Sequence, residues 1–188
     1  LIVTAITSLW IAVAWHRFIL REETPGGPVP PFNGPAISAY FIASVIFFLV
    51  LFVLSIPISI IAGIVLAPLF MAGVQPGIIG GMILGLVVYL PVAYVGYRIS
   101  PILPSAALGD RMPLRDAWYA TATSGSAFIV LAALSVVVSL VISAPATLLG
   151  TVIGSLWSFV IQWATVLVGA SILTTIYGHY VEGRPLNG

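Results

Sequence analysis

Two long stretches of the chain carry no charged side chain, and they constrain the fold more than any other feature. The first lies between Glu23 and Arg98, and the second lies between Asp116 and Glu182. The hydrocarbon core of a bilayer is about 30 Å thick, so a helix needs about 20 apolar residues to cross it. Each stretch is therefore long enough for two crossings joined by a turn.

The composition is typical of an integral membrane protein. Of the 188 residues, 61% are hydrophobic and 6% are charged, whereas about 25% of residues are charged in an ordinary soluble domain. The mean hydropathy is +1.21. Because disordered chains combine low hydrophobicity with high charge, the composition excludes a disordered chain as well as a water-soluble domain with a single core.

The apolar blocks predict an all-α fold, a polytopic transmembrane helical bundle that forms a single membrane domain over residues 1–188. We expect five spans in this sequence and six in the full chain, because the first apolar block begins at Leu1 and is short for a complete crossing. The expected spans are residues 1–15, 38–66, 76–97, 125–142 and 149–176. For residues 38–72, Pro57 and Pro68 leave two alternatives, one kinked span or a span followed by a re-entrant piece.

The charged residues lie in three windows, residues 17–23, 98–116 and 182–184. An even number of crossings separates the windows, so all three are expected on the same side of the membrane. All six cations are arginines, and positively charged loops stay in the cytoplasm. The prediction is a multi-pass protein of the bacterial inner membrane whose loops 16–37 and 98–124 and whose C-terminus are cytoplasmic.

A short amphipathic helix is predicted inside the second loop, at residues 113–121. Leu114, Ala117, Trp118 and Thr121 have the spacing of one helix face, and Arg115 lies on the opposite face. We expect this helix, with Leu114, Arg115 and Trp118, to lie at the membrane interface. It either docks the loop or binds a lipid or a partner.

Three segments around this loop resemble a family of bacterial membrane proteins: Tyr97–Ser100, Leu103–Ala107 and Met112–Trp118. They are similar to a cytoplasmic motif of a loose family of uncharacterised alphaproteobacterial multi-pass inner-membrane proteins. These proteins resemble the membrane domain attached to some glycerophosphodiester phosphodiesterases. The resemblance implies a six-helix membrane protein. It carries over no catalytic residue, because the phosphodiesterase chemistry belongs to a separate soluble domain.

Small residues recur at helical spacing in two of the expected spans. Such residues allow a neighbouring backbone to approach closely, which predicts helix packing or a partner interface. The residues are Gly77, Gly81 and Gly85 in one span, and Ser135, Ser139 and Ser143 in another.

The last span carries a polar stripe, whose members follow each other at alternating intervals of four and three residues. In lipid an unpaired amide is costly, so Gln162 is expected to be buried in the bundle. The stripe either holds helices together by hydrogen bonds or lines a substrate path or a groove. It consists of Thr151, Ser155, Ser158, Gln162, Thr165 and Gly169.

The scarcity of reactive side chains argues against several classes of function. There is no cysteine, and no Asp, Glu, Lys or Arg lies inside an expected span, which argues against a proton-driven transporter. A net charge of +1 gives no reason to expect a nucleic-acid partner. An intramembrane enzyme would need Asp116, His16 and His179 to converge, and their spacing does not require it. We expect no catalytic, cofactor-binding or metal-binding residues.

These observations favour a non-catalytic protein over an enzyme. The expected function is an accessory or scaffolding subunit of a larger membrane complex, respiratory or photosynthetic. Its expected partners are membrane lipids and other membrane protein subunits. The alternative is a facilitator that handles lipids or small solutes.

Overall fold

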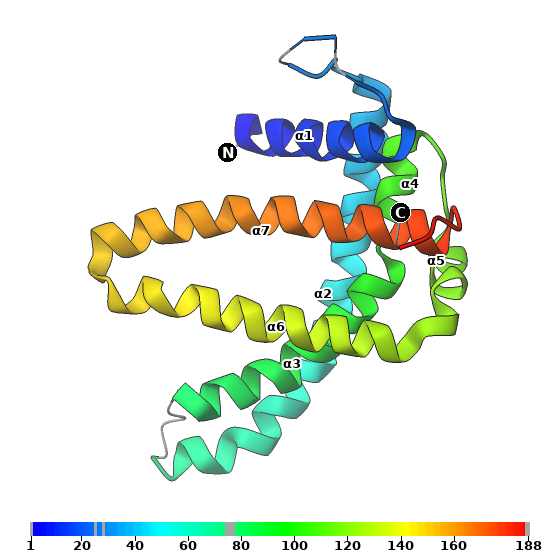
Figure 1. Cartoon of the computed structure of the whole chain (residues 1–188). Coiled ribbons are helices and arrows are strands. Elements are labelled where there is room, and N and C mark those ends of the chain that lie inside the picture. The colour runs from blue at the N-terminus through cyan, green and yellow to red at the C-terminus, as the bar shows by residue number, and fades with distance from the viewer. Residues whose placement is uncertain (1, 25, 28, 74–77, 187–188) are drawn as a thin grey trace. The chain divides into compact units, whose positions relative to one another are not determined.

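A computed structural model of the chain describes residues 2–24, 26–27, 29–73 and 78–186, and these residues confirm the predicted all-α class. Figure 1 shows the helices in chain order. They are α1 (Ile2–Arg21), α2 (Gly34–Met71), α3 (Ile78–Ile99), α4 (Ile102–Leu108), α5 (Leu114–Ala120), the 3₁₀-helix η1 (Ala122–Ser124), α6 (Gly125–Leu148) and α7 (Gly150–Tyr180).

Four helical segments among the described residues are long and apolar enough to cross a membrane, as expected of a membrane protein. They are Gly34–Leu69, Gly85–Leu108, Ala122–Ala146 and Gly150–Tyr180. These segments correspond to the last four of the five expected spans. Residues 2–15 of the first expected span lie within α1, which is helical but is not one of the four. The total of five spans therefore stays a prediction.

Helix α2 settles how residues 38–72 fold. It is one continuous helix of 38 residues that contains both Pro57 and Pro68, so the chain does not break into a separate re-entrant piece. At about 1.5 Å per residue such a helix extends well beyond the thickness of a hydrocarbon core. A helix of this length must tilt or project into the interface.

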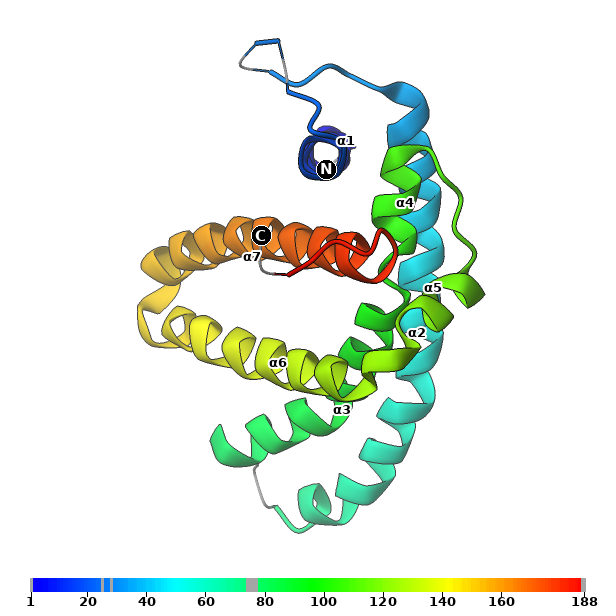
Figure 2. The ribbon, with the colours of Figure 1, turned by 45° about the vertical axis from the view of Figure 1, so that its right-hand side comes forward.

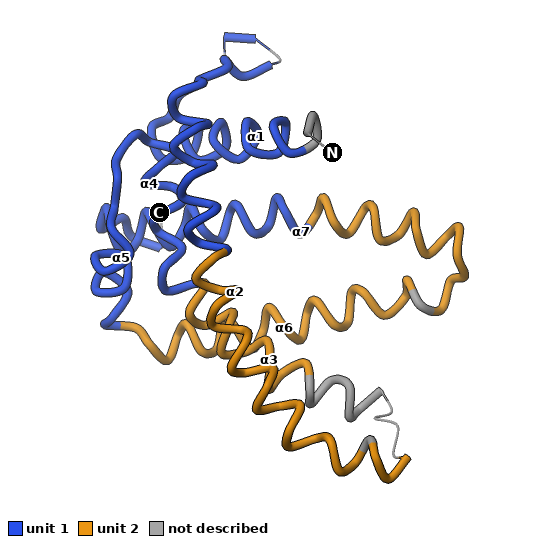
Figure 3. Tube along the Cα trace, turned by 180° about the vertical axis from the view of Figure 1, so that it is seen from behind, with its two compact units in different colours: residues 1–48, 97–123, 165–188 blue, residues 49–96, 124–164 orange. Residues whose placement is uncertain are grey.

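The chain forms two compact units, which Figure 3 colours separately. Unit 1 comprises residues 1–48, 97–123 and 165–188, and unit 2 comprises residues 49–96 and 124–164. Every charged residue and both histidines belong to unit 1, whereas the sequence of unit 2 contains none. The three charged windows are thus part of one unit, although their cytoplasmic location stays a prediction.

The centre of unit 1 is a helix that the sequence analysis missed. Residues 98–124 were expected to form a loop, but all seven residues of α4 are buried. Ile102, Leu103 and Ala107 belong to the main hydrophobic cluster of unit 1. Gly109 ends the helix with a positive φ of 91°, and its N–H donates to Ala106 O. The expectation of a loop is therefore wrong for this segment, which forms part of the core.

Helix α5 occurs where the amphipathic helix was predicted, but much of its apolar face turns inward. Ala117 and Thr121 are fully buried, and Leu114 packs against the cluster formed by α1, α2 and α4. Arg115 is exposed and Trp118 keeps 36% of its surface exposed. Leu114 thus covers the protein's own core, and lipid contact through Arg115 and Trp118 stays a prediction.

Unit 2 is held together by close helix contacts. A side chain at Gly85 of α3 would touch the Leu140 methyl groups of α6 at 3.8 Å, so this glycine packs against its own chain. Trp157 Nε1 of α7 donates to Ile142 O of α6 at 2.8 Å. Near the turn between these two helices, a side chain at Gly154 would overlap Ala146 O. Figure 1 shows α6 and α7 joined by this turn.

We predict that Gly154→Ala destabilises the α6–α7 hairpin by about 1–3 kcal/mol, the usual cost of overpacking. The added methyl group meets backbone atoms, which cannot rotate away. The measurement is the thermal unfolding midpoint of the purified protein in detergent. Gly63→Ala is the matched control, because nothing lies within 4 Å of the added atom. Equal midpoints for the two variants would contradict the prediction.

Candidate functional site

The buried polar side chains of the described residues all belong to unit 1. Polar groups in an apolar interior must be hydrogen-bonded. These side chains therefore mark the part of the interior where a polar site could lie. The set is His16, Arg98, Ser100, Ser105, Thr121 and Thr174.

His16 links three helices of unit 1 through a directed chain of hydrogen bonds. Thr174 Oγ1 of α7 donates to Ala170 O at 2.7 Å, so it accepts the bond of 2.8 Å from His16 Nδ1–H. The other ring nitrogen, Nε2, then accepts from the Tyr40 hydroxyl of α2 at 3.4 Å. These roles select the tautomer with its proton on Nδ1.

The imidazole of His16 is neutral at physiological pH. Burial lowers its pKa to about 4 from an ordinary value of 6.5, because the charged form would lose its hydration. The residue follows the expected first span and lies outside the four candidate spans. Both of its hydrogen-bond partners are hydroxyl groups, so the arrangement stabilises the fold and lacks the carboxylate that would make a histidine a strong base.

The three residues proposed for an intramembrane enzyme make separate contacts. His16 bonds to Thr174 and Tyr40, while His179 Nδ1–H donates to Arg184 O at 2.8 Å. Asp116 is exposed on α5. Within the described part of the chain, no group of three His, Cys, Asp or Glu side chains could hold a metal ion.

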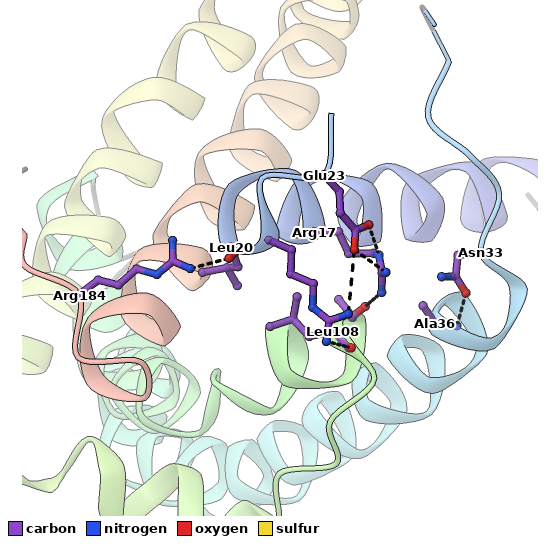
Figure 4. A network of polar contacts seen from close by, with 9 residues as sticks. Arg17, Leu20, Glu23, Asn33, Ala36, Leu108 and Arg184 are labelled. Carbon is purple, nitrogen blue, oxygen red and sulfur yellow. Dashed lines mark hydrogen bonds and ion pairs between the residues drawn. The ribbon is translucent and has the colours of Figure 1, made fainter. Parts of the chain in front are cut away.

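Four of the six arginines donate to carbonyl groups in the last turns of helices. Arg17 Nη1 donates to Ala107 O at 3.2 Å and Arg21 Nη2 to Leu108 O at 2.6 Å, both at the end of α4. Arg184 donates to Ile19 O and Leu20 O at the end of α1. Figure 4 shows the bonds at the end of α4 and the bond from Arg184 to Leu20 O, together with the ion pair between Arg17 and Glu23.

Arg98 makes the fourth such contact and fixes α5 to the end of α3. Its Nη2 donates to Trp118 O at 2.8 Å, and its Nε donates to Thr121 Oγ1 at 3.3 Å. The guanidinium lies 3.8 Å from the centroid of the Trp118 ring. The sequence analysis used Arg98 only as a topology marker, and nothing in the local pattern signalled its partner Thr121.

A cavity of about 650 Å³ in unit 1 lies between α1 and residues 30–35. Its walls include Trp10, Phe18 and Phe32, and the ion-paired Arg17 and Glu23 also line it. Trp10 Nε1 donates to Pro31 O at 3.3 Å, which attaches the proline-rich segment to α1. We call this cavity the aromatic groove.

A smaller cavity of about 270 Å³ lies between the ends of α1 and α7, also in unit 1. Ser171, Thr175 and His179 line it from α7. Both hydroxyl groups donate to carbonyls one turn earlier on the same helix. The hydroxyl protons of Ser171 and Thr175 are therefore already donated within α7.

The polar stripe of the last span lies on α7 as predicted, but it faces outward. Ser155 and Ser158 donate to Thr151 O and Gly154 O of their own helix, and Gln162 is exposed. The burial expected for Gln162 is therefore not found, since its side chain is exposed. Along the stripe, the exposed members are Thr151, Ser155, Ser158, Gln162 and Thr165, and Gly169 is half-buried.

The other predicted packing residues are only partly described. Gly77 and the surroundings of Gly81 lie outside the described residues, whereas Gly85 packs against α6. On α6, Ser135 is half-buried, and Ser139 and Ser143 are exposed. The serine row is thus largely uncovered, and its role as an interface stays a prediction.

Comparisons with known proteins identify no relative of this chain. No protein-family model matches it, and no curated protein and no solved structure is significantly similar to it. The resemblance to alphaproteobacterial inner-membrane proteins therefore stays a prediction.

We predict that the stability of unit 1 decreases as the pH falls from about 6.5 to about 4. In this range the unfolded imidazole of His16 takes up a proton, while the folded imidazole remains neutral. The loss reaches about 3 kcal/mol at the lower limit. Thermal unfolding in detergent across this pH range measures it. His16→Asn removes the titrating group, so its unfolding midpoint should change less with pH; identical profiles would contradict the assignment.

Proposed function

We propose that this chain is a non-catalytic membrane subunit that associates with other membrane proteins. The observation that carries the proposal is the exposed amide of Gln162 on α7. This residue lies within a helix that is long and apolar enough to cross a membrane. Its neighbours Phe159 and Val160 are also largely exposed, at 64% and 60%.

The physical argument is the cost of leaving an amide in hydrocarbon. An unpaired amide transferred from water to an apolar medium costs about 2–7 kcal/mol. No other described side chain or backbone group pairs with Gln162 in the chain itself. A partner protein that covers this face would remove the cost by hydrogen bonding, as polar residues do between membrane helices.

The finer features of the proposal follow from the sequence. The subunit would lie in the bacterial inner membrane with its three charged windows in the cytoplasm, in agreement with the positive-inside rule. The complex would be respiratory or photosynthetic. The charge-free unit 2 supports this role, because exposed apolar helices without Asp, Glu, Lys, Arg or His suit packing against other membrane helices.

We predict that Gln162→Leu releases the chain from its complex while leaving the fold intact. The substitution keeps a similar volume and removes the hydrogen-bonding group. The measurement is the native mass of the protein after extraction from its membrane in a mild detergent. Val160→Leu is the control, since it changes an exposed apolar position on the same helix and should not change the mass. A monomeric wild-type chain would contradict the proposal.

A second candidate function is the handling of lipids or small solutes, and the aromatic groove favours it. The groove is large enough for an extended apolar molecule and combines aromatic walls with one ion pair. Lipid ligands need this combination of an apolar surface and a polar end. In this case the chain would act alone, without a permanent protein partner.

We predict for this second function that Trp10→Ala reduces copurifying lipid several-fold. The substitution removes one wall of the groove and the bond to Pro31 O. Mass spectrometry of lipids bound to the purified protein measures the effect. Phe159→Ala is the control, because it removes an exposed ring that does not line the groove. If both variants retain the same lipid, the groove is not a lipid site.

A further inference from the structure

One buried donor of unit 1 has no acceptor. Among the described residues, Trp15 Nε1 of α1 is the buried side-chain nitrogen or oxygen for which the chain supplies no hydrogen-bond partner. Buried indole N–H groups are usually bonded, because an unpaired donor has lost its bond to water. The nearby His16 and Thr174, by contrast, bond to each other. An acceptor from outside the chain would therefore complete the polar contacts of this part of unit 1.

The position of Trp15 gives such an acceptor a place to enter. Trp15 lines the aromatic groove and also the smaller cavity between the ends of α1 and α7. Its nitrogen is shielded from solvent, but the two cavities give the indole space into which it can turn toward an incoming group. The groove has a volume of about 650 Å³, within the range of pockets that hold small molecules. The unpaired donor thus belongs to a wall of a cavity that is large enough for a ligand.

The polarity of the groove changes along α1. At one end lies Trp10, whose ring centroid is 5.7 Å from that of Phe32. At the other end lies Arg17, which pairs with Glu23 at 2.7 Å. At about 1.5 Å per residue, the two ends are about 10 Å apart along the helix axis, and Trp15 comes between them. A ligand that lies along α1 therefore places an apolar part at Trp10, a polar end at Arg17 and the group that joins them near Trp15.

Glycerolipids with acyl chains have this order of groups, since ester linkages join the apolar chains to the polar headgroup. An ester carbonyl accepts hydrogen bonds and has no donor of its own, so it matches a single N–H. Water is a poorer match, because an aromatic wall offers it few further partners. Arg17 is already bonded to Glu23 and to Ala107 O, so recognition in the groove does not depend on a charged headgroup.

We propose that the aromatic groove binds an acyl-ester lipid whose ester carbonyl accepts a hydrogen bond from Trp15 Nε1. The inference rests on the second candidate function, the handling of lipids, and deepens it by naming the group that is recognised. The acyl chains lie against Trp10 and Phe32, and the headgroup lies near the pair of Arg17 and Glu23. The groove then distinguishes ester lipids from ether lipids, which have a similar shape but no carbonyl.

Competition between two lipids tests the proposal. The probes are a diacyl phosphatidylcholine and the dialkyl ether phosphatidylcholine with the same chain lengths, offered in equal amounts to the purified chain in detergent. Native mass spectrometry measures the ratio of the two bound lipids. We expect the ester lipid to be favoured about fivefold, the effect of one hydrogen bond. A ratio of one for the wild-type chain overturns the proposal.

Substitutions at position 15 test the donor itself. Trp15→Phe keeps an aromatic ring without the N–H and should lower the ratio to about one. Trp163→Phe is the matched control, because it removes an indole of α7 that does not line the groove, and it should keep the ester preference. If phenylalanine disturbs the packing, the benzothiophene analogue of tryptophan at position 15 keeps the ring size, replaces the N–H by sulfur and should give the same ratio of one. An ester preference that survives in a folded variant at position 15 overturns the proposal.

The outcomes separate this inference from the lipid function on which it rests. Equal binding of the ester and ether lipids overturns the ester contact but leaves the second candidate function in place. Binding of neither lipid overturns both. A preference that is lost equally in Trp15→Phe and Trp163→Phe also overturns the inference, because the selectivity then does not come from the groove.

Discussion

The carbonyl groups at the ends of helices determine how unit 1 is built. The last carbonyls of a helix have no partner within it and carry a partial negative charge. In unit 1 arginine side chains supply the donors: Arg17 and Arg21 for α4, Arg98 for α5, and Arg184 for α1. The buried helix α4 receives two of these donors, one at Ala107 O and one at Leu108 O. Figure 2 shows α4 from a second direction, packed beside α2.

Sequence reasoning predicted the long helices well, because each of them follows from an uninterrupted apolar block. It missed α4 because a seven-residue apolar run bounded by Pro101 and Gly109 has no helical period of its own. Its contacts are with α1 and α2 and with Arg17 and Arg21, which lie far away in the sequence. The inward face of α5 was missed for a similar reason. An amphipathic pattern shows that one face is apolar, but it does not show whether protein or lipid covers that face.

In the candidate sites, too, local sequence spacing predicted some features, whereas others depend on contacts between residues that lie far apart in the sequence. The stripe on α7 could be read from its spacing alone, whereas the prediction that its own bundle covers Gln162 was wrong. Covering a helix face requires a particular neighbour, and only the three-dimensional arrangement identifies it. The pairing of His16 with Thr174 was also beyond local reasoning, since 158 positions separate the two residues.

The absence of charge from unit 2 has a consequence for how its contacts respond to solution conditions. Dissolved salt weakens interactions between exposed ionic groups, and the effect extends over about 8 Å at physiological ionic strength. Unit 2 contains no ionic group on which this screening can act. Contacts made by its helices are therefore insensitive to ionic strength. Concentrated salt can loosen the exposed ion pairs of unit 1, whereas charge screening leaves the apolar contacts within unit 2 unchanged.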